Sequence, residues 1–473
     1  MDDLSCFKPS NLLHSQERMT RYRPGGFHPV KLGDTFSNGR YKVYHKLGWG
    51  GFSTVWLARD QSSNRWVSLK ITAARDANVS RELTIHQKLR QARAANGVVQ
   101  LLDSFVHTGP NGNHQCLVFE LLGPAVETVV LDYAQGEDHL DPETIIGITR
   151  QLLEALSAMH RAGYAHGDVS GANMAFTTAR LATLSPSALF KIIGTPKTEK
   201  LVRLDGKPLA PGMPEQLVEK TGWEDWIDED EEDVRLIDFG EAFPHTAPPT
   251  KLAEPGGLQA PEGIFTGKFD YRVDLWRAGC TIYSLVTASR PFQYLGDMDV
   301  LVAQMIHFVE DLPAEWRPHW ERMKQTTGRP WNDIPAVMPS QSKLEERFTR
   351  HATDPSLRPL LSIIKGLMRF RPQDRISADE ALVLLDGPGP SKKLEPEPKP
   401  KVTAKPKATS TPLKATPVKK ATTTSGATST SKKVQASRTT PIAKTASAVT
   451  ATATATATVK QTTKATKGGI AKK

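Results

Sequence analysis

The chain has 473 residues, 38% of them hydrophobic, and its 61 Lys and Arg against 51 Asp and Glu give a formal net charge of +10. The excess positive charge is confined to the segment from Ser391 onward, which holds 18 basic and two acidic residues and leaves residues 1–390 with a net charge of −6. Because the positive charge lies in the tail and the rest of the chain is acidic, the net charge alone does not indicate a nucleic-acid-binding domain.

Three cysteines, Cys6, Cys116 and Cys280, lie far apart and form no CxxC pair. This spacing excludes a disulfide framework or a cysteine-rich zinc module, and it is typical of a reducing compartment. The first ten residues lack the basic-then-apolar pattern of a signal peptide, and no apolar run approaches the ~20 residues that span a bilayer. We therefore expect a soluble intracellular protein that does not associate with a membrane.

The sequence pattern changes along the chain. Residues 1–40 form a lead-in punctuated by Pro and Gly, and a domain over 41–387 follows. This domain begins with strand-like runs at 40–44 and 53–57, and apolar residues then recur at helical spacing over 144–160. Strands are thus expected first and helices later.

Two segments depart from this periodic pattern. Residues 178–233 lose the periodicity, and eight of the ten residues 224–233 are acidic, so that this run is expected to repel itself and stay exposed. Residues 388–473 contain no aromatic residue and few large aliphatic ones. Such a basic tail cannot bury enough apolar area to offset its ordering entropy, and we expect it to be disordered.

The first chemical signal is a glycine-rich run between two strand-like segments. A dinucleotide-binding motif would lead from a strand into a helix, whereas a hairpin that covers a nucleotide has strands on both sides and glycines that admit the phosphates. An ordinary β-turn is the alternative for this run alone. The candidate nucleotide-binding residues are Leu47, Gly48, Trp49, Gly50, Gly51, Phe52, Ser53, Thr54 and Val55.

Lys70 ends an apolar strand-like run, and Glu82 follows in a segment, 79–89, that is predicted to be helical. A buried lysine needs a partner to stay charged, so Glu82 can hold Lys70 against phosphate groups. The alternative is an exposed lysine beside a surface glutamate. It would be favoured for the pair alone, but not for a pair that follows a glycine-rich run.

A third motif has the spacing H-x-D-x-x-x-x-N at His166, Asp168 and Asn173. An aspartate can accept a proton from an attacking hydroxyl, and an asparagine five residues later can ligate a metal. Asp238 ends a strand-like run in Asp-Phe-Gly and offers a second metal ligand. With Gln259-Ala-Pro-Glu262 and Asp274-Leu-Trp276, these ordered motifs form the protein-kinase signature.

The chain from about 41 to 386 resembles a eukaryotic protein kinase and, more specifically, the SR-protein kinase family, its fungal members in particular. The specific resemblance rests on residues 22–34, on the Gly-Trp-Gly loop within 39–58 and on the position of the 178–233 insert. It implies an α+β, bilobal kinase fold with a small antiparallel β-rich lobe with one helix, a larger helical lobe, and ATP and Mg²⁺ between them. It also implies phosphorylation of serines in Arg-Ser-rich splicing factors, and hence regulation of mRNA splicing.

The resemblance implies a role for each matching residue. Asp168 is expected to be the catalytic base, and Asn173 and Asp238 the Mg²⁺ ligands. Lys70, paired with Glu82, is expected to bind the ATP phosphates.

Further matches concern the adenine site and the helical lobe. Phe119 would be the gatekeeper, and Glu120 and Leu122 would offer backbone hydrogen bonds to adenine. Glu262 and Arg375 would form a structural ion pair, for which the alternative is an exposed pair of little energetic value.

Three positions depart from the family pattern. Gly167 stands where many kinases have an arginine that reads a phosphate on the activation segment, which argues against a phosphorylation switch. Ser170 replaces a lysine that stabilises the transferring phosphoryl group, a loss of roughly 10²–10³ in rate by analogy with lost oxyanion donors. Ser68 replaces a small apolar residue over the adenine. We expect an active enzyme, and the alternative is a kinase-fold scaffold that binds Arg-rich partners.

The charge distribution suggests partners. The acidic body suits a basic Arg-Ser-rich substrate, with Glu310, Asp311 and Glu315 as candidates for a docking groove. Paired lysines in the tail suggest weak, salt-sensitive contact with polyanions. A monomer in the cytoplasm and nucleus is expected.

Overall fold

The computed structural model describes residues 4–74, 81–136, 138–177, 180–223, 226, 233–253, 256–294, 296–328 and 342–387. They belong to the first of two compact units, residues 1–394. The predicted disordered tail, 388–473, lies outside the described residues, and of the acidic run 224–233 only Trp226 and Asp233 are described.

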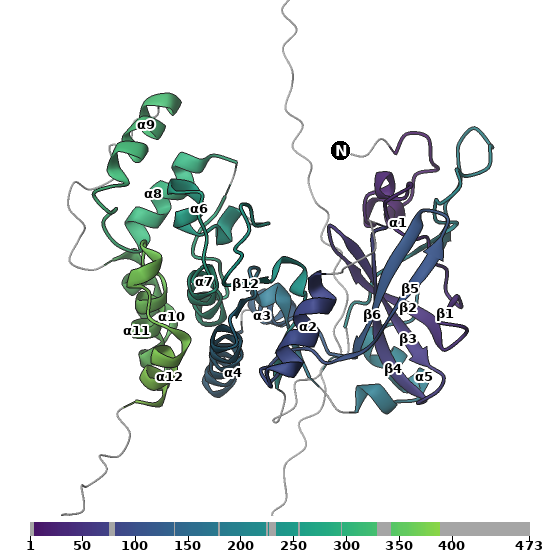
Figure 1. The fold of residues 1–473 in the computed structure, drawn as a ribbon, viewed down its shortest axis with the longest axis horizontal. Helices are drawn as coiled ribbons and strands as arrows, with labels where there is room; N and C mark the ends of the chain where they lie inside the picture. Colours follow the sequence, from purple (N-terminus) through teal and green to yellow (C-terminus); the bar gives the residue numbers. More distant parts are fainter. Residues whose placement is uncertain are drawn as a thin grey trace, which may run out of the picture. The chain divides into compact units, whose positions relative to one another are not determined.

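One lobe is built on a six-stranded antiparallel sheet with the strand order β1-β2-β3-β4-β6-β5 (Figure 1). Its inner side chains, such as Trp56, Leu69 and Val118, are buried in a core of their own. Helix α2, Arg81–Gln91, joins this lobe to the other, because its Ile85 and Leu89 lie in the main core of the molecule. The strands are β1, Thr35–Phe36, β2, Tyr41–Trp49, β3, Ser53–Asp60, β4, Arg65–Thr72, β5, Leu101–Gly109, and β6, Gly112–Glu120.

The insert at 178–233 shows no periodic pattern in the sequence, yet its described residues include a helix and a pair of strands. Helix α5, Pro186–Ile193, buries Leu189 and Ile193 against Leu57 and Trp66 of the sheet. A helix of the insert thus packs on the sheet of the small lobe, whose own helix is α2. Strands β9, Thr198–Lys200, and β10, Gln216–Val218, pair as a hairpin.

The lead-in packs against this insert. It contains the short helix α1, Asn11–His14, and its Tyr22 and Phe27 lie in one apolar cluster with Leu201 and Leu217 of the insert. The apolar content of both segments explains the packing, since neither could bury these side chains alone.

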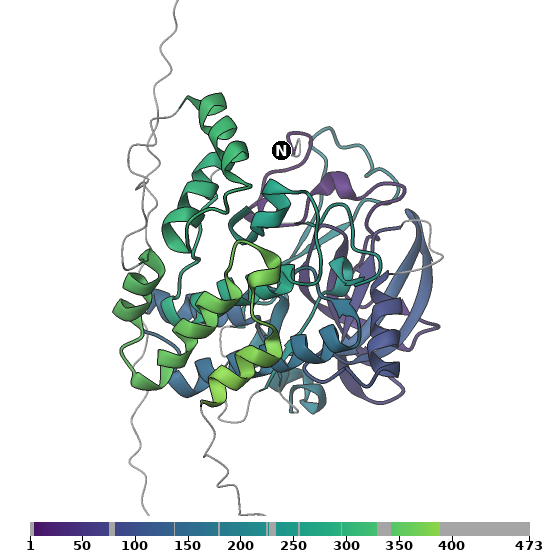
Figure 2. The same cartoon turned by 60° about the vertical axis from the view of Figure 1, so that its left-hand side comes forward.

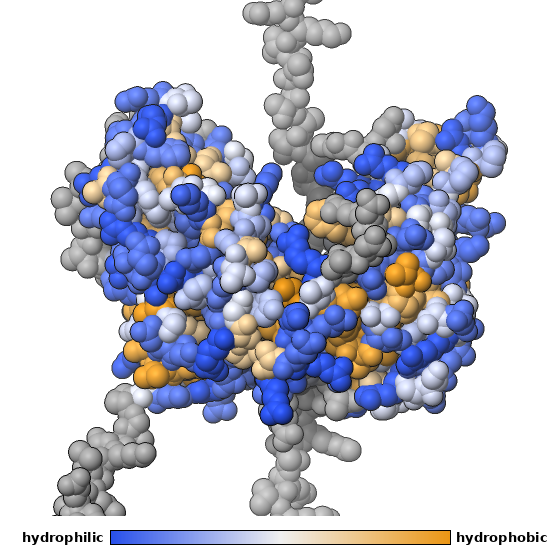
Figure 3. All heavy atoms as spheres, in the orientation of Figure 1, coloured by the Kyte–Doolittle hydropathy of each residue, from blue (hydrophilic) through white to orange (hydrophobic). Residues whose placement is uncertain are grey.

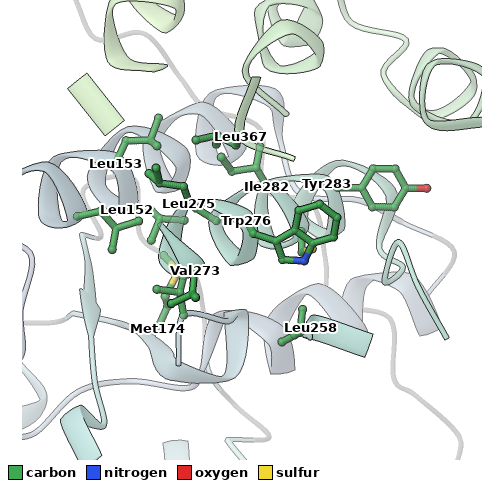
Figure 4. Packing of buried hydrophobic residues seen from close by; sticks show 14 of the residues in the cluster. Leu152, Leu153, Met174, Leu258, Val273, Leu275, Trp276, Ile282, Tyr283 and Leu367 are labelled. Carbon is green, nitrogen blue, oxygen red and sulfur yellow. The ribbon is translucent and has the colours of Figure 1, made fainter. Parts of the chain in front are cut away.

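The second lobe is helical, as expected, and is organised around α7, Val273–Thr287. Fourteen of the fifteen residues of α7 are buried, which is the property of a helix surrounded by protein on all sides. Figure 4 shows Trp276 and Ile282 of α7 among side chains from α4, such as Leu152, and from α11, such as Leu367. This helix is the rigid centre on which the lobe is assembled.

Other helices surround α7, and α12 packs along α4 (Figure 2). The helix bounds are α3, Val126–Gln135, α4, Pro142–Arg161, α6, Pro261–Phe265, α8, Met298–Phe308, α9, Arg317–Thr327, α10, Lys343–His351, α11, Arg358–Leu367, and α12, Ala378–Asp386. Short strands β7, Tyr164–Ala165, β8, Met174–Phe176, β11, Val234–Leu236, and β12, Phe243–Pro244, carry the loops between the lobes.

The visible face of the protein is mostly hydrophilic, with scattered apolar patches (Figure 3). Within the described ranges, no helix is both long enough and apolar enough to cross a membrane.

The expected ion pair between Glu262 and Arg375 is present and buried. Two nitrogens of the Arg375 guanidinium donate to the two carboxylate oxygens over 2.8 and 2.5 Å, and the side chains are 0% and 2% exposed for Arg375 and Glu262. The alternative of an exposed pair is therefore wrong.

Removal of this carboxylate should be costly, because it leaves a buried guanidinium without its counter-charge. We expect Glu262→Ala to lower the free energy of unfolding by about 3 kcal/mol, measured by urea denaturation. Glu315→Ala is the matched control: it breaks an exposed pair with Arg371 and should change stability little. Equal effects of the two substitutions would contradict the structural role of Glu262.

The small lobe should lose stability in acid because of His28. Its ring is buried against His107 and His114, with centroids 4.5 and 5.0 Å away, and burial together with these two histidines lowers the pKa of His28 to about 3. The unfolded chain takes up this proton near its ordinary pKa of about 6.5 and the folded one does not, so stability falls as the pH drops below about 6.5.

We expect His28→Leu to remove about 2 kcal/mol of the stability difference between pH 7.5 and pH 5, measured by urea denaturation at both values. The pKa values of His107 and His114 are also lowered by burial, so part of the acid sensitivity should remain. An unchanged pH dependence in the variant would show that His28 is not held neutral.

Candidate active site

The glycine-rich run forms the turn of the β2–β3 hairpin, with strands on both sides. Gly48 lies opposite Val55, and the Gly50 N–H donates to the Ser53 carbonyl over 2.9 Å. A Cβ atom added at Gly48, Gly50 or Gly51 would meet nothing within 4 Å. The backbone is therefore open to the close approach of a ligand.

The side chains of the hairpin have different environments. Ser53 and Thr54 are buried, and the Thr54 hydroxyl accepts a hydrogen bond from the Trp56 indole over 3.0 Å. The side chains of these two residues are therefore not available to a ligand. Phe52 is exposed at the tip, where Arg21 of the lead-in stacks on its ring and donates to the Gly51 carbonyl. Leu47, Trp49 and Val55 are partly buried.

Lys70, Glu82 and Asp238 meet at one point between the lobes. The Lys70 Nζ lies 2.8 and 2.7 Å from the two Glu82 oxygens and 2.9 Å from Asp238 Oδ1. Lys70 and Glu82 are buried, whereas the Asp238 side chain is 48% exposed. Lys70 on β4 thus connects α2 to the loop that follows β11.

The electrostatics of this cluster favour the charged forms of Lys70 and Asp238, whereas burial raises the pKa of Glu82. Burial alone would lower the pKa of Lys70, but the attraction of Glu82 and Asp238 outweighs it and raises this pKa above its ordinary value. Burial likewise works to raise the pKa of Asp238, and the charge and hydrogen bond of Lys70 bring it below the ordinary value. Lys70 is therefore held as a cation that faces an exposed carboxylate.

The candidate adenine-binding residues lie where β6 ends. Phe119 is buried against His86, and Ser68 of β4 lies opposite it. The Glu120 N–H already donates to the Gln100 carbonyl over 3.1 Å, so a bond from Glu120 to a base would have to use its carbonyl. Leu122 follows, and its side chain is buried.

The loop between β7 and β8 carries Asp168 and is tied to α7 by a buried carboxylate. Asp274 accepts from the backbone N–H groups of His166 and Gly167 over 2.7 and 2.8 Å. Gly167 has a φ of +77°, and a Cβ atom there would lie 2.5 Å from the Glu241 carbonyl. The backbone path thus has no room for the arginine that many kinases have at this position.

The carboxylate of Asp168 is held at both oxygens. Asn173 Nδ2 donates to Oδ2 over 2.7 Å, and Arg277 Nη1 of α7 donates to Oδ1 over 2.5 Å. Ser170 contributes an N-cap, since its hydroxyl accepts from the Asn173 N–H. The sequence analysis did not identify Arg277, although its place in the Asp274-Leu-Trp-Arg run, one helical turn after a recognised residue, was a usable signal.

The residues present fit a magnesium ion bound together with phosphate. Asn173 uses its amide nitrogen on Asp168, which leaves Oδ1 as its available ligand, and Asp238 adds an exposed carboxylate. Mg²⁺ prefers oxygen ligands and commonly takes only one or two from protein beside phosphate and water. The described residues include no cluster of three or more His, Cys, Asp and Glu that could hold a metal without such help.

A cavity of about 600 Å³ lies beside this loop, bounded by α3, α7 and residues 256–258. Ser170 and Glu127 line it, and the Glu127 carboxylate pairs with Arg290 over 2.6 Å. The cavity gives a polypeptide segment access to the loop of Asp168.

The acidic residues expected to form a docking groove are mostly occupied. Glu310 accepts from Arg369 and from the Phe370 N–H, and Glu315 binds Arg371 through both oxygens. Asp311 is exposed. Residues close to the Asp168 loop, rather than these, are the better candidates for recognition of a basic peptide.

Comparison with known proteins agrees with this arrangement. The family model described as "Protein kinase domain" matches residues 41–189 and 226–384, and the interval it omits lies in the insert. The crystal structure of the PF14_0431 kinase domain superposes with a TM-score of 0.52 at 19% identity, over 76% of this chain and 98% of that one. This likeness shows the fold.

Curated relatives are more similar in sequence. Protein kinase dsk1 of Schizosaccharomyces pombe is 39% identical over 168 residues, which are 34% of this chain and 30% of dsk1. The serine/threonine-protein kinase SRPK of Physarum polycephalum is 30% identical over 312 residues, 60% of this chain and 68% of the relative. The chain thus spans less than a third of dsk1 and about two thirds of the Physarum protein.

Gly167 provides a test of the loop geometry. We expect Gly167→Ala to lower the free energy of unfolding by about 2–3 kcal/mol, because it adds both a left-handed alanine and a collision with Glu241. Gly163→Ala, at a φ of +83° with nothing within 4 Å, should cost only about 1 kcal/mol. Equal losses in thermal or urea unfolding would contradict the close approach of Glu241.

Proposed function

Because this chain belongs to the protein kinase family, we propose that it is a serine/threonine protein kinase that transfers the γ-phosphoryl group of ATP to protein hydroxyls. The observation that carries this proposal is the contact of Lys70 with Glu82 and Asp238 at 2.7–2.9 Å. In active kinases the Lys–Glu pair and the aspartate of Asp-Phe-Gly must both be in place, and here they meet at one nitrogen.

Each residue then has a role in the transfer. The hairpin of Gly48 to Val55 covers the phosphates of ATP, and Lys70 neutralises part of their charge. Asp168, fixed by two hydrogen bonds, accepts the proton of the substrate hydroxyl. Asn173 Oδ1 and Asp238 would hold Mg²⁺, which neutralises phosphate charge when it is bound. The backbone of Glu120 and Leu122 would bind the adenine.

The proposed substrates are serines in Arg-Ser-rich proteins resembling splicing factors, with a role in mRNA splicing. Two observations support this choice. The relatives include a kinase named SRPK, and residues 1–390 carry a net charge of −6, which attracts a basic peptide. The proposal includes a monomer in the cytoplasm and nucleus, and a tail that makes weak contacts with polyanions.

Ser170 favours a second candidate function. A kinase-fold scaffold with weak or no phosphotransfer would bind Arg-rich partners, which the net charge of −6 of residues 1–390 attracts equally. This candidate differs from the first only in the chemical step, because the residues that would bind ATP are the same.

The two candidates are separated by one assay on the full-length protein with Mg²⁺ and labelled ATP. We expect an Arg-Ser repeat peptide to be labelled in preference to a proline-directed peptide. Asp168→Ala should reduce labelling by at least 10³-fold, since it removes the base and its contacts. Asp141→Ala, at an exposed aspartate that precedes α4 and makes no side-chain capping bond, is the matched control and should retain full labelling.

The other outcomes are equally informative. Labelling of the proline-directed peptide alone would keep the kinase and reject the substrate class. Absence of labelling with ATP binding intact would reject the kinase and favour the scaffold.

A further inference from the structure

Helix α7 directs two charged side chains at the loop of Asp168 from within the core. Asp274 and Arg277 are one turn apart, and both are fully buried. Asp274 binds the loop backbone at His166 and Gly167, whereas Arg277 binds the side chain of Asp168. The same helix face thus fixes both the course of the loop and the orientation of its reactive group.

Arg277 is buried in surroundings that offer its guanidinium few partners besides Asp168. Arg277 is 0% exposed, and among the described residues Asp168 is the only carboxylate within 4 Å of it. Its Nη2 donates to the Ala253 carbonyl over 3.3 Å, and its Nε is buried without a hydrogen-bond partner in the described part of the chain. A buried arginine with an unsatisfied nitrogen destabilises a core compared with an apolar residue, so stability alone does not explain it.

The loop between β7 and β8 has no cationic side chain at position 170, where the family pattern has a lysine. Ser170, two residues after Asp168, is a short hydroxyl residue whose oxygen is used to cap residues 171–173. The guanidinium of Arg277 instead contacts the carboxylate of Asp168, with Nη1 at 2.5 Å from Oδ1. Asn173 holds Oδ2, so the two contacts set the direction in which the remaining lone pairs of Asp168 point.

We propose that Arg277 is a positioning residue for phosphoryl transfer, which takes over from the lysine that is missing at position 170. It holds the Asp168 carboxylate in orientation and places a fixed positive charge beside the reacting groups. Because the charge is buried and held by a helix whose residues are almost all buried, it needs no rearrangement during the reaction. This inference rests on the proposed kinase activity.

The test is a charge exchange in the full-length protein. Arg277→Met keeps similar length without the charge, and we expect it to lower kcat by about 10²–10³-fold while KM for ATP and peptide changes by less than about threefold. Arg277→Lys should recover part of the loss. Adding Ser170→Lys to Arg277→Met should raise kcat again by at least tenfold, because position 170 lines the open cavity and has room for a lysine.

Arg272→Met is the matched control. Arg272 immediately precedes α7 and pairs with Asp270 at a partly exposed position, so its replacement should leave kcat unchanged. A wild-type kcat in Arg277→Met would overturn the proposal. A loss that Ser170→Lys does not relieve would also overturn it, since a merely structural role predicts that result.

Thermal unfolding separates failure of this inference from failure of the kinase proposal. If the ion pair exists, Arg277→Met should lower Tm more in the wild-type background than in the Asp168→Asn background. Equal shifts would reject the pair whatever the activity. If the wild-type protein phosphorylates no peptide, both proposals are overturned. If the Tm shift of Arg277→Met nevertheless depends on Asp168 in that case, the pair is a purely structural contact.

Discussion

The buried carboxylate of Asp274 is the interaction on which the candidate site depends. It accepts two backbone hydrogen bonds from the loop and a third from His160 over 3.0 Å. Burial works to raise the pKa of Asp274, but the hydrogen bond and charge of His160 with those of the loop lower it below the ordinary value. An ionised group without these partners would cost several kcal/mol, so the helix and the loop stabilise each other.

This arrangement divides the work between the lobes. The helical lobe holds Asp168 and Asn173 through a helix that has almost no exposed surface, and this protects their geometry from movements of the sheet. The small lobe contributes Lys70 and the glycine hairpin. Because Glu82 lies on α2, the contact of Lys70 with Asp238 is a charged link from the small lobe to the loop after β11.

The sequence predicted those features that depend on local patterns. The hairpin and the Lys70–Glu82 pair follow from fixed motifs, and α4 follows from helical periodicity. The Glu262–Arg375 pair, whose members are 113 residues apart, was expected only from the family resemblance. Arg277 was missed because its partner is 109 residues away, and its place one helical turn after Asp274 was not used as a signal. The same reason applies to Glu310. It was expected to be free to bind a basic peptide, but it pairs with Arg369, which is 59 residues away. The packing of the insert was missed because its apolar residues find their partners far away in the sequence, in the lead-in and in the sheet.

The cluster shared by the lead-in and the insert changes what counts as the independently folding part of this chain. Tyr22 and Phe27 cover Leu201 and Leu217, and the buried Lys46 of β2 has its counter-charge, Glu17, in the lead-in. A chain cut where the recognisable motifs begin would expose this apolar surface and leave a buried ammonium unpaired. The autonomous unit therefore starts well before the first motif, and the insert is part of its core.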